Sequence, residues 1–377
     1  MQQGWGGTAE NELPDQSVLR MQQNLYKFSA AKHASMQLEI NQQLYDKNGN
    51  LLPFDEFKAK LDSLGIKYNK TWLQTEYRTA KQSGQTAQFW QDIQANKALY
   101  PNLKYKTQED DRVRDEHEKL NDIIAPIDDD FWNWAYPPNG WNCRCFTVQT
   151  AEEPSNVIPK SDLGIKPEFH MNVGKTGQVF NENTETGHRF FALAKESPDW
   201  EKRFELSKLE GGFNTVKTPK GNKVKVSIYA HEKDLVNNLE KAIQISDQQN
   251  INVEIRPHLN IQGWKNPEYK IGNIIADLYR GDIKNGFLLK RKQIKKAIEQ
   301  LQNTYPDKAF SNRYAIVFDI TNVRQSQDLA KYINGKFRSG NNLEFIIITN
   351  KSNSVKINRT DNFETIEMKY AEITKEK

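Results

Sequence analysis

Residues 110–145 read DDRVRDEHEKLNDIIAPIDDDFWNWAYPPNGWNCRC, and this stretch decides how the first half of the chain folds. It begins with charged side chains and ends with aromatic residues and prolines that run into Cys143-Arg144-Cys145. Proline fixes φ and lacks an N–H donor, and Asn139-Gly140 is typical of a turn, so the stretch cannot form one regular element. Its aromatic side chains need burial. We therefore predict a compact, irregular segment that polar groups hold together, and we call it the 110–145 segment.

Cys143 and Cys145 are the only cysteines of the chain. Because a bridge across one intervening residue is strained, we expect no disulfide, and this cysteine usage is typical of a protein that folds in a reducing compartment. With His117, the two thiols are ligands that zinc accepts, so we predict a structural zinc site. A fourth ligand would come from one of three aspartates, Asp110, Asp111 and Asp115. The alternative is that His117 bonds to an aspartate and both thiols are simply packed.

The order of rare residues in this segment carries a resemblance. DDRVR, then His117, then Phe131-Trp132, then YPPNGWNCRC at 136–145 resembles the phage Mu F-like minor head proteins, and Arg78-Thr79-Ala80 also fits that pattern. The resemblance implies a helix-rich head-morphogenesis domain, which we place in residues 1–187. It also implies phage portal and capsid proteins and packaged DNA as partners, and a location in the bacterial cytoplasm and the interior of the virion.

Charge is unevenly distributed along the 377 residues. Residues 1–223 carry 28 basic and 31 acidic side chains, whereas residues 224–377 carry 25 and 18. The C-terminal part should therefore favour a polyanion, unless the excess only solvates its surface. The longest apolar runs, 315–318 and 345–348, suit strands, so no signal peptide or membrane span is expected.

Hydrophobic periodicity divides the chain into three parts. Helical patterns occupy residues 17–45, 53–64 and 71–90, and residues 188–223 are predicted to be a linker or pre-toxin segment. From residue 224, helices are expected at 230–247, 289–303 and 327–337. Strands are expected at 251–255, 269–279, 314–320, 343–349 and 355–358. The prediction is an α+β protein whose small C-terminal domain, residues 224–377, has an antiparallel sheet.

A second resemblance lies in this C-terminal domain. GWKNPEYKI at 263–271 and Ala276-Asp277-Leu278, with HEKDL at 231–235 and FIIITN at 345–350, resemble the C-terminal tRNase toxin domains of contact-dependent-inhibition exoproteins. Those domains have a barnase/EndoU/colicin/RelE-like fold, and Mu F-like proteins that carry them look like polymorphic toxins of prophages. The resemblance implies a toxin that cleaves RNA, with tRNA expected, in the cytoplasm of a target cell. A producer of such an RNase needs a cognate immunity protein, which should be acidic.

A metal-independent RNase needs a base, an acid and a cation that stabilises the phosphorane charge, and no cofactor. Five residues are the candidate catalytic groups: Asp277, His258, Arg280, Lys290 and Thr349. Six further basic residues are expected to bind RNA phosphates: Lys284, Arg291, Lys292, Lys295, Lys296 and Arg338. On a helical wheel the basic residues of 291–296 fall opposite an apolar face, so that helix can pack and bind at once.

Two other functions remain open. A metal-dependent DNase of the restriction-endonuclease type has an acid after a proline and then acid-x-Lys on the next strand. Pro267-Glu268 and Asp277-Leu278-Tyr279 nearly fit that pattern, but Tyr279 stands where the lysine is required. The second alternative is a basic domain that binds packaged DNA without catalysis.

Overall fold

The computed structural model describes residues 13–44, 46–47, 50–67, 70–161, 163–308, 310–321, 329–339 and 341–374. The chain forms two compact units, which consist chiefly of Pro14–Phe204 and Glu205–Lys377. Their boundary lies inside the expected linker. The first part of that linker forms α6 (Arg189–Lys195) and α7 (Trp200–Ser207), and its last part forms strand β4 (Phe213–Lys217). None of the described helices is long and apolar enough to span a membrane.

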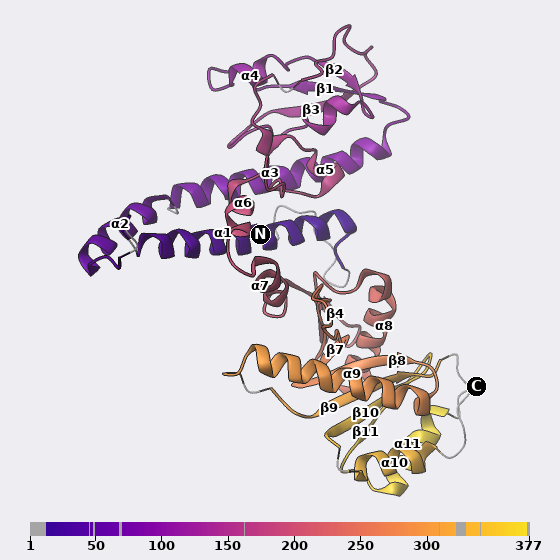
Figure 1. The fold of residues 1–377 in the computed structure, drawn as a ribbon. Helices are drawn as coiled ribbons and strands as arrows, with labels where there is room; N and C mark the ends of the chain where they lie inside the picture. Colours follow the sequence, from indigo (N-terminus) through magenta and orange to yellow (C-terminus); the bar gives the residue numbers. More distant parts are fainter. Residues whose placement is uncertain are drawn as a thin grey trace. The chain divides into compact units, whose positions relative to one another are not determined.

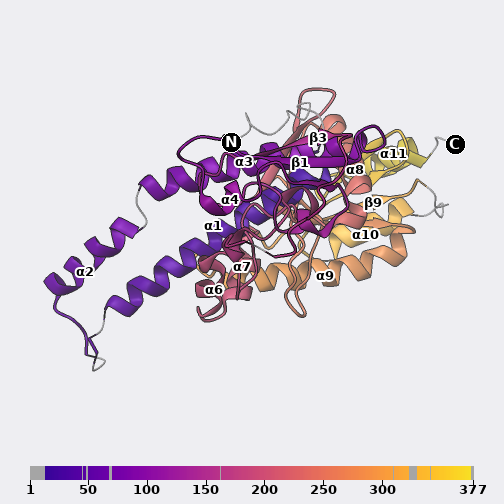
Figure 2. The ribbon, with the colours of Figure 1, turned by 90° about the horizontal axis from the view of Figure 1, so that it is seen from above.

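Three long helices begin the first unit: α1 (Gln16–Gln43), α2 (Phe54–Lys67) and α3 (Lys70–Ala95). α1 starts at Asp15, whose carboxylate accepts the N–H groups of the next turn. α1 and α3 lie side by side, and α2 joins them at their far end (Figure 2). The helical patterns predicted from sequence are therefore present.

The 110–145 segment contributes strand β2 to a three-stranded antiparallel sheet of order β2-β1-β3. The strands are β1 (Asn102–Lys106), β2 (Ile124–Pro126) and β3 (Phe146–Thr150), with short helical turns at α4 (Asp115–Glu118), η2 (Asp130–Asn133), η3 (Pro167–Phe169) and α5 (Val173–Thr176). Two buried rings have polar partners: Trp132 Nε1 donates to the Pro126 carbonyl at 3.0 Å, and Tyr136 donates to the Thr86 carbonyl at 2.9 Å. The prediction of an irregular segment held by polar groups is confirmed.

His188 lies in the aromatic core of the first unit. Its ring centroid is 4.8 Å from those of Phe28 and Phe190, and its Nδ1 accepts the Phe190 N–H at the start of α6. Burial, followed by the charges of Arg189 and Lys32, lowers the pKa of His188 to about 4. The folded protein therefore keeps this imidazole neutral where an unfolded chain would protonate it.

We predict a pH dependence from this histidine. Between pH 6.5 and 4 the unfolded state binds a proton that the folded state does not, so stability is full above pH 6.5 and falls as the pH drops through this window, by up to roughly 3 kcal/mol. His188→Asn keeps a helix-capping acceptor and removes the titration. The stability difference between the wild type and the variant, measured in urea at pH 7.5 and 5, should shift by about 2 kcal/mol, the part of the effect that falls above pH 5. His33→Asn, at an exposed position of α1, is the control, and a difference that does not change with pH would contradict the prediction.

The second unit is built on an eight-stranded sheet of order β11-β10-β9-β8-β7-β6-β5-β4 among the described residues. Besides β4, the strands are β5 (Lys223–Ser227), β6 (Val253–Ile255), β7 (Tyr269–Ile271), β8 (Ile274–Arg280), β9 (Tyr314–Asp319), β10 (Leu343–Thr349) and β11 (Ser354–Asn358). The pairs β5–β6, β8–β9 and β9–β10 are parallel and the other four are antiparallel. The α+β class is confirmed, with antiparallel pairs in the majority.

Helices cover both faces of this sheet (Figure 1). They are α8 (Glu232–Gln249), α9 (Ile283–Thr304), α10 (Leu329–Arg338) and α11 (Phe363–Thr374). All six residues of β9 are buried: Tyr314, Ile316 and Phe318 pack with α9, α10 and α11, whereas Ala315 and Val317 pack on the α8 side. A strand covered on both faces needs a continuous apolar run, and this explains why the sequence there does not alternate.

The predicted strand 269–279 is in fact a hairpin of β7 and β8. The chain turns at Gly272, whose φ of +58° favours glycine, and Ile271 pairs with Ile274. The sequence prediction of one strand was wrong, because Gly272-Asn273 forms a glycine-first two-residue turn that divides the apolar run. The hairpin brings Glu268, before β7, next to Asp277 in β8.

Candidate functional site

Two carboxylates and a lysine form the candidate active site of the second unit, and we call Glu268, Asp277 and Lys290 the acid–lysine cluster. The Leu278 N–H lies 3.2 Å from Glu268 Oε2 and 3.1 Å from Asp277 Oδ1, so the two carboxylates are neighbours. Lys290 Nζ lies 2.9 Å from Asp277 Oδ2 and 4.0 Å from Glu268 Oε2. One cation thus faces two acids.

Exposure increases across the cluster. The side chain of Asp277 is 3% exposed, that of Lys290 14% and that of Glu268 27%, so solvent reaches the cluster from the Glu268 side. Burial raises the pKa of Asp277, and the charges of Lys290 and the buried Arg256 oppose this rise. Arg256 donates to the Pro267 carbonyl at 3.0 Å, and burial lowers its own pKa to about 10.

Helix α9 supplies the lysine. Asp282 caps the helix by accepting the Asn285 N–H at 3.0 Å, and Gly286 lies directly against the ring of Tyr279 in β8. Lys290 follows one turn later and meets Asp277. The sequence pattern required a lysine at position 279, two residues after Asp277, whereas the structure supplies it from the helix that packs over the strand.

A cavity of about 160 Å³ lies beside Glu268. Its walls include His231, His258, Asn238 and Arg256. The rings of His231 and His258 are 4.9 Å apart, and burial, then the neighbouring His231, lowers the pKa of His258. Glu268 belongs to both the cavity and the acid–lysine cluster, so a ligand of the cavity would be adjacent to the two acids.

Arg280 and Thr349, also predicted to be catalytic, lie elsewhere. Arg280, at the end of β8, donates to the Asn238 amide oxygen at 2.7 Å and lies 4.0 Å from Asp319. Thr349 is fully buried in β10, and its hydroxyl is 3.4 Å from the Phe318 carbonyl. The structure therefore brings Asp277 and Lys290 together and leaves Arg280 and Thr349 outside their cluster, since no contact joins them to it within the described ranges.

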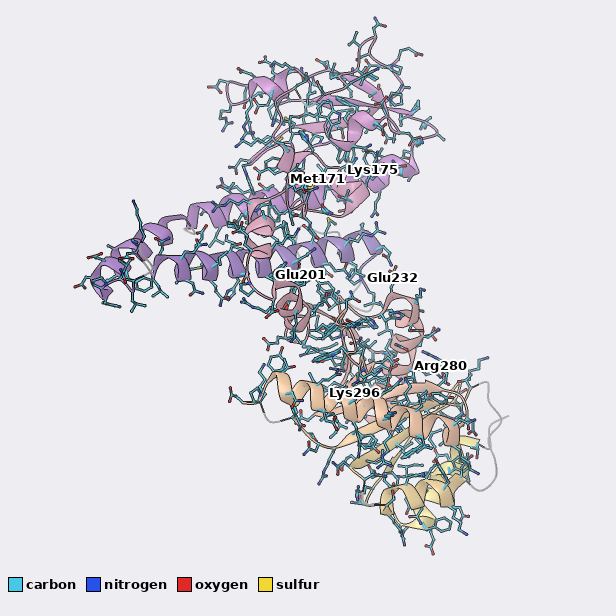
Figure 3. All side chains as sticks on the ribbon, in the orientation of Figure 1. Met171, Lys175, Glu201, Glu232, Arg280 and Lys296 are labelled. Atoms are coloured by element: carbon cyan, nitrogen blue, oxygen red, sulfur yellow. The ribbon has the colours of Figure 1, made fainter. Side chains whose placement is uncertain are left out.

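The basic residues predicted to bind RNA are only partly displayed on the surface. The buried residues of α9 include Ile294, Ala297, Ile298 and Leu301, the apolar side of the helical wheel. The exposed lysines are Lys284, Lys292 and Lys296, while Arg291 and Lys295 are half-buried, and Arg338 is exposed at the end of α10. Figure 3 labels Lys296 on α9. The exposed face of α9 thus carries three lysines, which we call its cationic face, together with the exposed Leu288, Leu289 and Glu299.

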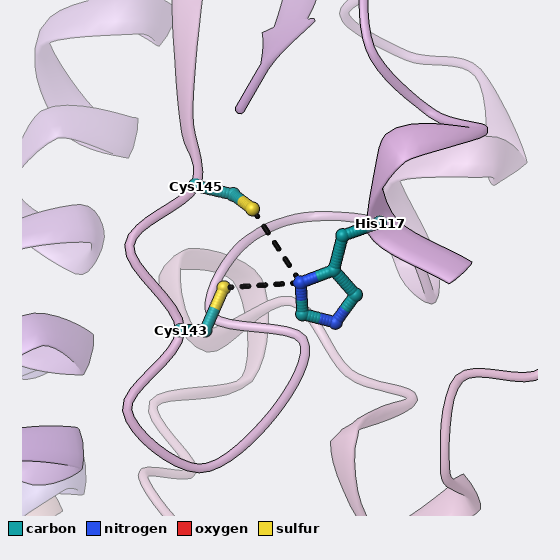
Figure 4. Close-up of side chains that lie close together, drawn as sticks. All are labelled: His117, Cys143 and Cys145. Carbon is teal, nitrogen blue, oxygen red and sulfur yellow. Dashed lines mark hydrogen bonds between the residues drawn. The ribbon is translucent and has the colours of Figure 1, made fainter. Parts of the chain in front are cut away.

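In the first unit, the three predicted metal ligands meet. His117 Nδ1 lies 3.8 Å from Cys143 Sγ and 3.5 Å from Cys145 Sγ, and all three residues are buried (Figure 4). Among the described residues no aspartate joins this group, and Asp110 is instead bonded to Arg144 at 2.6 and 2.7 Å. In the alternative, the bond of His117 to an aspartate was wrong, because Nε2 of His117 contacts the Asn139 carbonyl.

Comparisons with known proteins concern the first unit. Residues 29–148 match the family described as Phage Mu protein F like protein. The chain is 44% identical over 68 residues to the "Putative capsid assembly protein F" of Escherichia phage Mu, which covers 18% of this chain and 15% of that protein. It is 34% identical over 76 residues to the "Mu-like prophage FluMu F protein" of Haemophilus influenzae, covering 20% and 17%. No solved structure matches this chain.

Proposed function

Because residues 29–148 are a Phage Mu protein F-like domain, we propose that the protein is a phage or prophage head component that carries a nuclease. The similarity to a capsid assembly protein supports the head role, with portal and capsid proteins and packaged DNA as partners and the virion as location. The nuclease is the second unit, and it hydrolyses a phosphodiester bond at the acid–lysine cluster. RNA, and tRNA in particular, is the expected substrate in the cytoplasm of a target cell.

The observation that carries this proposal is that Glu268 and Asp277 contact the same backbone N–H, that of Leu278. Lys290 also contacts both carboxylates. Paired carboxylates, of which Glu268 is open to solvent and Asp277 is buried, suit a hard cation such as Mg²⁺. A bound Mg²⁺ would lower the pKa of a water and offset negative charge on the scissile phosphate. Lys290 fixes Asp277 and adds a positive charge beside the phosphate. Tyr279 stands where the sequence pattern requires a lysine, and in the folded protein a lysine from α9 lies beside the two acids instead.

Substrate binding and protection use the cationic face of α9. Lys284, Lys292 and Lys296 are exposed on a helix whose other face is packed, with Leu288 exposed between the first two, so the lysines can contact phosphates without disturbing the core. The same surface suits a small acidic immunity protein that would cover it in the producing cell.

A metal-independent RNase is the second candidate, and the histidine pair favours it. His231 and His258 lie 4.9 Å apart in the cavity beside Glu268, where one imidazole can accept a proton and the other donate one. This is the reaction expected from the resemblance to tRNase toxins.

Divalent-ion dependence separates the two candidates. We expect the full-length protein, dialysed against EDTA, to leave a tRNA mixture and plasmid DNA intact, and to cleave the RNA when Mg²⁺ is returned. Gel analysis of both substrates and sequencing of the RNA ends would give the substrate and the cut. EDTA would also remove any metal that His117, Cys143 and Cys145 bind. The control is therefore to return Mg²⁺ without zinc.

Each other outcome has a definite meaning. Cleavage of RNA that continues in EDTA supports the histidine pair and excludes the metal-assisted reaction. Mg²⁺-dependent cleavage of DNA and not of RNA supports the acid–lysine cluster as the active site, with DNA in place of RNA as the substrate. No cleavage of either, together with harmless expression in bacteria, leaves a head component that binds DNA without catalysis.

A further inference from the structure

We propose that His117, Cys143 and Cys145 bind one zinc ion through three protein ligands and one water. The three residues are 2%, 3% and 5% exposed, and their ligand atoms lie within 4.8 Å of one another. They come from α4 and from the chain just before β3, so the ion would join two parts of the 110–145 segment that are about 26 residues apart.

The histidine is oriented as a metal ligand. Its Nε2 is 3.2 Å from the Asn139 carbonyl oxygen. Because a carbonyl oxygen only accepts, Nε2 carries the proton and Nδ1 presents its lone pair. Hydrogen bonding of the second ring nitrogen to a backbone carbonyl is the usual way in which a ligating imidazole is held. Asn139 is itself fixed, since its side-chain oxygen accepts the Tyr105 hydroxyl at 2.9 Å.

Both thiols point at the same ring nitrogen. Cys143 and Cys145 are directed at His117 Nδ1 (Figure 4). That nitrogen has one lone pair and can accept from only one of them. The two thiols also lie within hydrogen-bonding reach of each other, and Cys145 lies within reach of Tyr105. A zinc ion would instead accept a lone pair from each of the three converging atoms at once.

The spacing fits tetrahedral zinc. Zn–S and Zn–N bonds of about 2.3 and 2.0–2.1 Å at the tetrahedral angle place sulfur and nitrogen about 3.6 Å apart. The two observed separations are 3.5 and 3.8 Å. Two thiolates and a neutral imidazole also offset the charge of Zn²⁺, so the complex would have no net charge, which suits a buried site. Thiolate with imidazole is a donor set that selects zinc over the hard cations Mg²⁺ and Ca²⁺.

The fourth position opens on a small cavity. A space of about 20 Å³ adjoins the three ligands and is lined also by Gln108, Arg112 and Arg114. This is enough for one water. Asp110 is held by Arg144 and is not needed to complete the site.

Metal analysis of the full-length protein tests this proposal. We expect one zinc per chain by plasma mass spectrometry. Replacement by Co²⁺ should give the visible and near-ultraviolet absorption of a tetrahedral ion with thiolate ligands. Chelation should lower the melting temperature of the first unit by roughly 10 °C or more. Cys143→Ser/Cys145→Ser and His117→Gln should lose the ion. Two control variants, Asp110→Asn and His170→Gln, should retain it, because His170 bonds to the Ile165 carbonyl away from the cluster.

The wild-type cobalt spectrum needs no variant, so it remains informative if the ligand variants fail to fold. A protein that binds neither zinc nor cobalt after reduction overturns the proposal. So does a mass 2 Da lower with no free thiol, which would identify a disulfide between the two cysteines. Zinc retained in all ligand variants would identify adventitious binding elsewhere.

Discussion

Asp277→Asn is expected to lower the rate of nucleic-acid cleavage at least about 100-fold and to relieve any growth arrest that the wild-type protein causes in bacteria. The substitution keeps the shape of the side chain and removes the charge that faces Lys290 at 2.9 Å. It also removes one of the two carboxylates that a cation would need. Initial rates on tRNA and survival after induced expression are the measurements.

A loss of folding must be separated from a loss of chemistry, because breaking a buried ion pair leaves the remaining charge unpaired and costs about 3–5 kcal/mol. Asp277→Asn combined with Lys290→Gln removes both charges, and should recover much of the free energy of unfolding without recovering activity. Asp282→Asn is the matched control, since Asp282 only caps α9 and asparagine caps equally well. Full activity in a folded Asp277→Asn protein would exclude the acid–lysine cluster as the active site.

Gly286→Ala is expected to destabilise the second unit by about 2 kcal/mol and to reduce cleavage at the same time. A Cβ atom at Gly286 would lie 2.2 Å from Cδ1 and 2.6 Å from Cγ of Tyr279, atoms near the base of that ring. Either the ring or α9 must move. Because Lys290 lies one turn further along α9, a shift of the helix away from β8 would separate it from Asp277.

Gly335→Ala is expected to change the stability in the opposite direction. Gly335 lies in α10, and no atom is within 4 Å of where its Cβ would be. Alanine there should stabilise the protein by about 0.5–1 kcal/mol, as expected for a glycine inside a helix. Urea unfolding and tRNA cleavage of both variants are the measurements. If Gly286→Ala also stabilises and keeps full activity, close packing of α9 on β8 does not position the lysine.

Much of the architecture is determined locally, and the sequence is sufficient for it. The apolar spacing along α1, α8 and α9 predicts those helices, since a periodic stripe is a property of neighbouring residues. The apolar run of β9 predicts a strand covered on both faces. The order of residues in the 110–145 segment indicates a Mu F-like domain, and the match of residues 29–148 supports it.

Strands β4 and β5 and helix α11 of the second unit are absent from the sequence prediction. β4 is a short edge strand in a segment rich in turn residues, and α11 follows directly on the last hairpin with a weak amphipathic pattern. The β7–β8 hairpin turns at Gly272-Asn273, a glycine-first pair that suits a two-residue turn, but the pair stands inside a run of apolar residues that favours one continuous strand.

The composition of the chain thus determines which side chains are available, while the tertiary structure alone decides which of them meet. Glu268 and Asp277 become neighbours only because the register of the hairpin pairs Tyr269 with Ala276. Lys290 joins them because α9 packs across β8. His117 reaches Cys143 and Cys145 because the chain between them folds back through the aromatic core. Such contacts join residues far apart in sequence, and they are set by packing and strand register, which no local pattern encodes.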